Sequence, residues 1–148
     1  CALVGPSEFG PLALRHSRIP YLLCFAFQKM ASALRPGVLA CGILANTYVA
    51  KLYMSFGIRI SGKIGTDEGA NASKAQLNEA EYSGPFLAAL LYLSAKGVEC
   101  SYGGVIALLG QVVYTWSRIF GLPIFPIGAL TRYIALPMLI TSIYKTLD

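Results

Sequence analysis

The sequence predicts an all-α membrane protein, a four-helix bundle with four transmembrane helices and an N-terminal interfacial segment. Of its 148 residues, 55% are apolar and only 13% are charged, whereas soluble domains carry about a quarter charged residues. The apolar residues fall into four stretches, and the length allows about four spans of roughly 20 residues with short connections. This composition excludes intrinsic disorder, which needs low hydrophobicity and high charge. The length leaves no room for a separate soluble catalytic domain.

Charge and cysteine content exclude two further classes of function. The formal net charge is +5 and the twelve Lys and Arg residues are scattered along the chain. No basic stripe can therefore follow a phosphate backbone, and we expect no nucleic-acid partner. The cysteines form no C-x-x-C pair, so we expect neither a zinc site nor a redox dithiol. We interpret them as small hydrophobic residues; they are Cys1, Cys24, Cys41 and Cys100.

Residues 1–36 form the first of two predicted domains. This segment carries four basic residues against a single acid, Glu8. Such a bias suits an amphipathic segment on an anionic membrane surface, and also the remnant of an organelle-targeted precursor; we favour the surface segment. Its apolar stretch from Ile19 to Phe27 contains Pro20 and is too short to span a bilayer.

The second domain, residues 37–148, is predicted to hold all four spans. The first span runs from about Gly37 to Phe56 and contains Asn46 near its middle. A polar side chain at that depth should face another helix and form a hydrogen bond there. The following residues, 61–71, contain three glycines and two acids without periodicity, which predicts an aqueous loop.

Caps and turn formers predict three further helices. Ser73 followed by Gln76 is the pattern of a capping box, so the second helix should begin at the next residue and reach about Ala95. The third helix is predicted over 103–120 and the fourth over 127–144. Proline and glycine residues between these two predict a tight turn, which makes the last two helices antiparallel neighbours.

The polar start of the second helix holds the candidate binding residues. At about 100° per residue, Lys74, Asn78 and Glu81 fall on one stripe, whereas Gln76 and Glu79 project to the other side. A lysine near the helix N-terminus favours an anion there, and Glu81 two turns deeper favours an ammonium group. The stripe therefore suits a zwitterionic ligand. The alternative from spacing alone is a solvated first turn with one interhelical hydrogen bond.

The run from Lys74 to Phe86, KAQLNEAEYSGPF, resembles the second-helix signature of the MAPEG family, the membrane-associated proteins in eicosanoid and glutathione metabolism. The segment from Gly110 to Tyr114 resembles the third-helix signature of that family with one change. The similarity covers about residues 37–146 and all four predicted spans. It implies a four-helix membrane bundle, typically a homotrimer that binds glutathione between neighbouring subunits.

The resemblance also implies roles for individual residues. Lys74 would replace the arginine that holds a glutathione carboxylate, and Gln76 would face the site of an adjacent subunit. The implied chemistry is activation of the glutathione thiol to a thiolate by nearby positive charge, followed by attack on an electrophile or a lipid epoxide. The residues implied to line the glutathione site are Asn78, Glu81, Tyr82 and Tyr114.

Several positions depart from the family pattern. Lys74 keeps the charge of the family arginine but lacks its planar fork, and Gln111 replaces the third-helix arginine. Phe125 and Ile127 stand where active members often place an arginine that stabilises the thiolate. Arg118 lies one helical turn after the third-helix tyrosine on the same face and is the candidate catalytic residue. Its other interpretation is an arginine that extends to the membrane surface before the turn.

Two functions stay open at the level of sequence. The first is a glutathione-dependent transferase or peroxidase in the endoplasmic reticulum or another organelle membrane, with further copies of the chain as partners. The second is a catalytically silent accessory or structural subunit of a larger membrane complex, with unrelated membrane subunits as partners. The lipid bilayer is a partner in both cases. We favour the first function, with glutathione as its cofactor.

Overall fold

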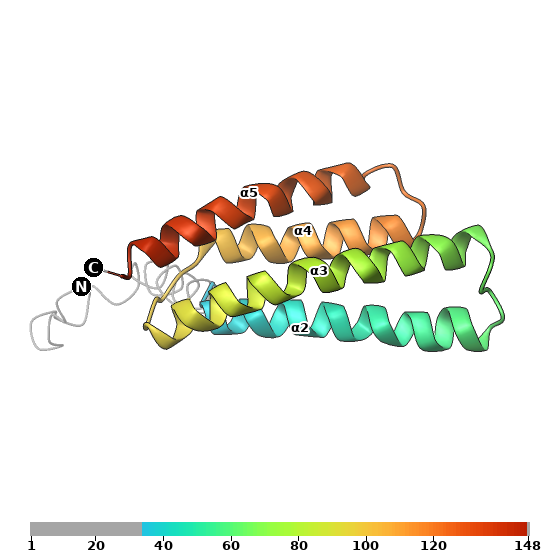
Figure 1. Cartoon of the computed structure of the whole chain (residues 1–148), viewed down its shortest axis with the longest axis horizontal. Coiled ribbons are helices and arrows are strands. Elements are labelled where there is room, and N and C mark those ends of the chain that lie inside the picture. Colours follow the sequence, from blue (N-terminus) through green and yellow to red (C-terminus); the bar gives the residue numbers. More distant parts are fainter. Residues whose placement is uncertain (1–33, 148) are drawn as a thin grey trace, which may run out of the picture.

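The computed structural model describes residues 34–147 as an antiparallel helical bundle (Figure 1). The predicted all-α class is confirmed for these residues, which contain no strand. The predicted surface segment lies almost wholly in residues 1–33, outside the described residues. The elements in chain order are α2 (Pro36–Leu52), the π-helix η2 (Tyr53–Ile60), α3 (Asp67–Ala95), α4 (Tyr102–Ile119) and α5 (Phe125–Tyr144).

Each long helix runs opposite to the one before it (Figure 1). Because η2 continues α2 without a break, the two form one rod. The helices α4 and α5 lie side by side, as predicted from the turn between them. One end of the bundle therefore carries both the turn from η2 to α3 and the turn from α4 to α5.

Among the described residues, two helical segments are long and apolar enough to cross a bilayer. They are Pro36–Ile60, with 25 residues, and Phe125–Tyr144, with 20 residues. A span of about 20 apolar residues matches the hydrocarbon thickness of a typical membrane. The helix α3 carries its polar residues in its first half, which lowers its mean hydropathy. Length and composition thus identify two helices that could span a membrane.

The bundle exposes large apolar side chains and buries two charged ones. Large apolar side chains on α2 and α5 are more than half exposed, among them Leu44, Leu130 and Ile140. In contrast, Glu79 and Arg132 are at most 2% exposed. This arrangement departs from that of water-soluble proteins in its exposed apolar side chains and in these two buried charges, although the other charged side chains of the described residues are exposed or half-buried. It suits a helical protein whose outer surface contacts lipid.

Two apolar clusters stabilise the bundle, and a polar layer lies between them. Residues from all four long helices form the larger cluster: Leu39, Ala40, Ile43, Phe86, Leu90, Leu93, Ala107, Ala135 and Leu139. The smaller cluster, near the turn from η2 to α3, consists of Ile58, Ala72, Ala75 and Ile119. The polar layer consists of Asn46, Glu79, Gln111, Thr115 and Arg132.

The start of α3 differs from the prediction. The helix begins at Asp67, two turns earlier than expected, and its N-cap is Thr66, whose hydroxyl accepts from the backbone N–H of Gly69 at 3.2 Å. The two acidic residues in the first turn complement the positive end of the helix dipole. Ser73 is therefore an exposed residue inside the helix, and the predicted capping box is wrong. The predicted loop is also too long, because only residues 61–66 connect η2 to α3.

The other helix boundaries lie within about one turn of the predicted ones. The first span continues as a π-helix to Ile60, and α4 begins after Ser101, whose hydroxyl accepts from the backbone N–H of Gly104 at 3.1 Å. The helix α5 begins at Phe125 and ends at Tyr144.

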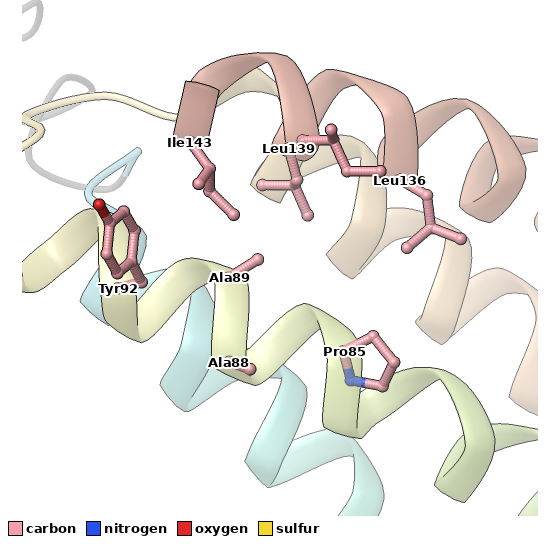
Figure 2. Close-up of a pocket in the computed structure, with 8 residues that line it drawn as sticks. Pro85, Ala88, Ala89, Tyr92, Leu136, Leu139 and Ile143 are labelled. Atoms are coloured by element: carbon pink, nitrogen blue, oxygen red, sulfur yellow. The ribbon is translucent and has the colours of Figure 1, made fainter. Parts of the chain in front are cut away.

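An apolar groove of about 420 Å³ separates α3 from α5 (Figure 2). The two alanines on its α3 side leave this space because their side chains are short. Its lining residues are Pro85, Ala88, Ala89, Tyr92, Leu136, Leu139, Ile140 and Ile143.

Candidate functional site

Arg132 is a buried arginine inside the apolar helix α5. Its Nη1 donates to Gln111 Oε1 at 3.0 Å, and its Nη2 donates to Asn78 Oδ1 at 2.6 Å. Its Nε has no hydrogen-bond partner among the described residues. A guanidinium carries five N–H donors, so two neutral oxygens leave most of them free. In the described part of the chain, no carboxylate forms an ion pair with Arg132.

Two tyrosine rings cover the guanidinium of Arg132. Its central carbon lies 3.8 Å from the ring centroid of Tyr114 and 4.4 Å from that of Tyr82. These distances are typical of cation–π contacts, which stabilise a desolvated guanidinium by about 2 kcal/mol. The Tyr82 ring also packs edge-on against Tyr133, with centroids 5.9 Å apart. Aromatic faces therefore hold the arginine where a carboxylate would otherwise be expected.

Two glycines let α4 and α5 approach closely enough to build this arrangement. A Cβ added at Gly128 of α5 would lie 2.4 Å from the backbone nitrogen of Tyr114. A Cβ added at Gly110 of α4 would lie 2.8 Å from Cγ of Arg132 and 3.1 Å from its backbone nitrogen. Only a residue without a side chain fits at such contacts. The glycines thus set the position of Tyr114 and Arg132 relative to each other.

A groove of about 430 Å³ opens beside the covered guanidinium. Its polar walls come from α3, α4 and α5, and its rim comes from the first turns of α5. A groove of this size is within the range of small-molecule sites, and a few convergent polar groups are what such sites use for orientation. We call it the Arg132 groove. It is lined by Asn78, Tyr82, Tyr114, Phe125, Pro126, Ala129, Leu130, Arg132 and Tyr133.

The structure gathers part of the predicted site. Three predicted ligand-binding residues, Asn78, Tyr82 and Tyr114, lie together in the Arg132 groove. The other three on α3 do not line it: Lys74 and Glu81 are exposed, and Gln76 is half-buried.

Arg118, the candidate catalytic residue, lies at the edge of this region rather than inside the groove. Its guanidinium carbon is 4.8 Å from the ring centroid of Phe125, and that ring packs edge-on against Tyr114 with centroids 6.4 Å apart. Phe125 therefore stands between Arg118 and the groove. Arg118 does lie one helical turn after Tyr114 on α4, but the ring of Phe125 packs against both residues and separates Arg118 from the groove.

Sequence reasoning missed Arg132 as a functional candidate, although a signal was present. An ionisable residue within an apolar span is costly and usually faces a functional or polar site. Arg132 lies on the same face of α5 as Gly128, Ala135 and Leu139, all of which are buried. That spacing indicates a residue directed into the bundle. Gln111, which departs from the family pattern in sequence, accepts a hydrogen bond from Arg132 through its amide oxygen.

Glu79 forms a second polar centre, on the other side of α3. Its Oε1 accepts from Asn46 Nδ2 at 2.9 Å and from Thr47 Oγ1 at 3.0 Å, and its Oε2 accepts from Thr115 Oγ1 at 2.8 Å. Trp116 Nε1 donates to Asn46 Oδ1 at 3.0 Å. The predicted interhelical hydrogen bond of Asn46 is thus confirmed. Three donors satisfy the buried carboxylate, which ties α2, α3 and α4 together.

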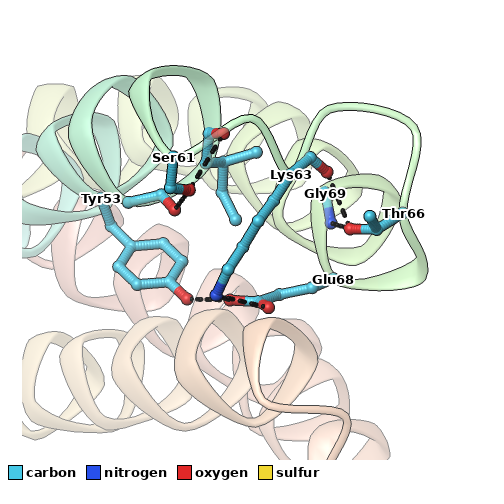
Figure 3. Close-up of polar contacts among 8 residues, drawn as sticks. Tyr53, Ser61, Lys63, Thr66, Glu68 and Gly69 are labelled. Atoms are coloured by element: carbon cyan, nitrogen blue, oxygen red, sulfur yellow. Dashed lines mark hydrogen bonds and ion pairs between the residues drawn. The ribbon is translucent and has the colours of Figure 1, made fainter.

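A third polar cluster closes the turn between η2 and α3 (Figure 3). Glu68 accepts from the hydroxyl of Tyr53 at 2.7 Å, and its other oxygen lies 2.9 Å from Lys63 Nζ. Glu68 lies outside the two apolar segments. The hydrogen bond from Tyr53, reinforced by Lys63, holds the pKa of the Glu68 carboxyl below its ordinary value. The carboxylate is therefore ionised at neutral pH.

Within residues 34–147, fold and site together define a helical bundle with two potential membrane spans and a buried cationic side chain beside an aromatic groove. No protein-family model, curated protein or solved structure matches this chain.

Proposed function

We propose that this chain is a MAPEG-like integral membrane protein that binds glutathione in the Arg132 groove and uses its thiol against electrophilic or lipid substrates. The observation that carries the proposal is the state of Arg132. It is 2% exposed, bonds only to neutral oxygens and has no ion pair among the described residues. Glu79 acts on this charge only from a distance, and a buried charge without a direct counter-ion is strongly unfavourable, so an anion that reaches this groove gains affinity. Glutathione supplies carboxylates and an ionisable thiol.

The family resemblance independently supports the Arg132 groove as the glutathione site. The family resemblance assigns Asn78, Tyr82 and Tyr114 to a glutathione site, and the fold brings these three residues to Arg132. In this proposal Asn78 orients the guanidinium, and the tyrosines flank the ligand. Arg132 supplies the positive charge that family members carry on arginines in the regions where this sequence has Gln111 and Ile127. Its charge lowers the free energy of the thiolate, and the thiol proton passes to water. The thiolate sulfur then forms a bond to the electrophilic carbon while the bond from that carbon to its leaving group, or to the epoxide oxygen, breaks; the leaving group departs with the electron pair, and an epoxide alkoxide takes a proton from water.

The proposal includes four spans in an endoplasmic reticulum or other organelle membrane. The helices α3 and α4 belong to the same bundle as the two apolar segments, so a bilayer that surrounds those segments surrounds the whole bundle. The exposed apolar side chains on α2 and α5 supply the lipid-facing surface. Lys74 and Glu81, exposed on α3, would then face a neighbouring subunit of a homotrimer, and Gln76 would reach that subunit's site.

The test is titration calorimetry of glutathione into the detergent-purified protein. Arg132→Met removes the charge and keeps an unbranched side chain in place of the arginine stem, and Arg59→Met is the matched control because Arg59 is exposed outside the groove. We expect saturable binding by the wild type and the control, and a loss of about tenfold or more in Arg132→Met. Arg132→Lys should keep part of the affinity, because the charge stays but the fork is lost.

Circular dichroism must show that each variant keeps its helices. Glu81→Ala should also lose glutathione binding if a neighbouring subunit completes the site. Unchanged binding by folded Arg132→Met would show that the Arg132 groove is not the glutathione site.

The second candidate function is a catalytically silent accessory or structural subunit. The observation that favours it is the same low exposure of Arg132, because a guanidinium between two rings and two amides is also a structural tie between α3, α4 and α5. This function predicts no glutathione binding up to millimolar concentrations by a folded protein. It also predicts a single copy among unrelated subunits, which the mass of the complex purified from native membranes would show.

A further inference from the structure

Two adjoining hollows lie at the end of the bundle that carries both turns. Figure 1 shows the two turns at this end. The first, of about 200 Å³, contains Arg118, Asn71 and Phe125 in its walls and is called the Arg118 hollow. The second, of about 450 Å³, is called the Glu68 hollow. Asn71 and Gly121 line both, so the two hollows share one wall.

The Arg118 hollow offers a positive charge with free donors. The Arg118 guanidinium lies 4.8 Å from the centroid of the Phe125 ring, which holds it against the start of α5. Its Nε is buried and has no hydrogen-bond partner, and it forms no ion pair within residues 34–147. A planar guanidinium with unused N–H groups binds phosphate oxygens well. The side-chain amide of Asn71 lines the same hollow and can donate a further N–H hydrogen bond to a phosphate oxygen.

The Glu68 hollow offers a negative charge and aromatic rings. The ionised carboxylate of Glu68 lines it together with Tyr53 and Phe120, whose ring centroids are 6.3 Å apart. Trp116 stacks on Phe120 with centroids 5.9 Å apart. Aromatic faces beside a carboxylate are the groups that bind ammonium and quaternary ammonium ions. Lys63 Nζ already shares the carboxylate at 2.9 Å, from an exposed position.

Both hollows lie where a spanning bundle meets the lipid headgroups. One apolar segment ends with η2 at Ile60 and the other begins with α5 at Phe125, and the turns that follow η2 and precede α5 both lie at this end of the bundle. Aromatic side chains gather at this level in membrane proteins. A ligand here therefore contacts the headgroup layer and not the hydrocarbon core.

We propose that this end of the bundle binds the headgroup of a zwitterionic phospholipid, with its phosphate on Arg118 and its ammonium group in the Glu68 hollow. The opposite charges of Arg118 and Glu68, in hollows that share a wall, complement the charges of phosphocholine or phosphoethanolamine, in which a phosphate and an ammonium group are joined by a short linker. The inference rests on the proposed function only for the membrane location of the bundle. Phe125 lines both sites, but the two charged residues of the lipid site, Arg118 and Glu68, do not line the Arg132 groove.

The experiment measures binding of short-chain phosphatidylcholine to the delipidated full chain in detergent, by native mass spectrometry. Phosphatidic acid with the same tails lacks the ammonium group, and inorganic phosphate lacks both tail and ammonium. We expect Arg118→Gln to weaken phosphatidylcholine binding about tenfold. The matched control Arg59→Gln removes the same charge from an exposed position at the same end and should change the affinity by less than about twofold. Lys63→Gln should strengthen binding, because it removes the ammonium that competes for Glu68.

Four results would overturn the proposal. Equal binding of phosphatidic acid and phosphatidylcholine excludes the ammonium subsite, and weaker binding by Lys63→Gln does the same. Equal effects of Arg118→Gln and Arg59→Gln indicate general surface attraction, and displacement of the lipid by inorganic phosphate indicates a free-phosphate site. Arg132→Met, which tests glutathione binding, should leave the lipid affinity unchanged, so the two proposals can fail separately.

Discussion

Arg132 of α5 and Asn78 of α3 are joined by a 2.6 Å hydrogen bond between residues 54 positions apart in the chain. The bond connects two helices that are not consecutive, and it places the guanidinium next to the Arg132 groove. A neutral amide oxygen is an unusual main partner for a buried arginine, because it orients the charge without neutralising it. The charge therefore stays available to an anionic ligand.

Glu79 and Glu81 are predicted to differ in their effect on stability. Glu79→Gln places an amide nitrogen among the donors Asn46, Thr47 and Thr115, so at least one buried group loses its partner. We expect a loss of about 1 to 3 kcal/mol in the free energy of unfolding. The exposed Glu81→Gln is the matched control and should change it by less than about 0.5 kcal/mol. Denaturant unfolding in micelles measures both; equal effects would contradict the buried network.

Gly128→Ala should separate α4 from α5. The new Cβ would meet the backbone nitrogen of Tyr114 at 2.4 Å, and backbone cannot move aside as a flexible side chain can. We expect a loss of about 1 to 3 kcal/mol in unfolding free energy. Gly84→Ala is the control, because nothing lies within 4 Å of a Cβ there. That variant should be neutral or stabilise α3 by up to about 1 kcal/mol. A Gly128→Ala protein as stable as Gly84→Ala would refute the close approach.

The structure places the N-cap of α3 at Thr66 and not at Ser73, so the two residues should differ in their effect on stability. Thr66→Ala removes the hydroxyl that accepts from the Gly69 backbone N–H and should cost about 1 kcal/mol. Ser73→Ala, at an exposed site within the helix, should change stability by less than about 0.5 kcal/mol. Thermal unfolding of the two variants side by side decides between the two possible starts of the helix. The reverse order would restore the capping box at Ser73.

Acid is expected to loosen the turn between η2 and α3. The folded pKa of Glu68 is lowered by its hydrogen bond from Tyr53 and by Lys63. The stabilisation is complete above the ordinary carboxyl pKa, and it is lost as the pH falls below about 4 and through the lowered folded value. Trp116, the single tryptophan, lies 6.1 Å from the Tyr53 ring, so its fluorescence should report the transition. Tyr53→Phe removes the hydroxyl and should move the transition to higher pH; an unchanged midpoint would exclude this role of Tyr53.

Much of the helical framework could be predicted from the order of apolar residues. A run of about 20 apolar residues forms a helix whatever its neighbours are, because burying a backbone in an apolar medium requires internal hydrogen bonds. The buried carboxylate Glu79 was also predictable from the spacing of buried residues on α3. It lies one heptad before Phe86 and two before Leu93, and all three are buried on α3. Counting this repeat through the polar part of the helix would have identified Glu79, and not Glu81, as the interior carboxylate.

The candidate site could be predicted only in part, because its residues come from three helices. The resemblance of the segment around Asn78 located one wall of the Arg132 groove. No pattern within that segment indicated that an arginine more than fifty residues later would complete it. The distance between such residues depends on how closely α4 and α5 pack, and glycines at 110 and 128 determine that packing.

The sequence by itself determined the class of this protein: helices, turns and the apolar segments follow from local composition and spacing. Tertiary structure decided which polar side chains meet. A helical wheel gives the angle between two residues on one helix, but the rotation of that helix in the bundle is set by burial of apolar side chains against its neighbours. Packing of Leu139 and Ala135 within the larger apolar cluster directs Arg132 inward, and only there can its charge lie between Tyr82 and Tyr114.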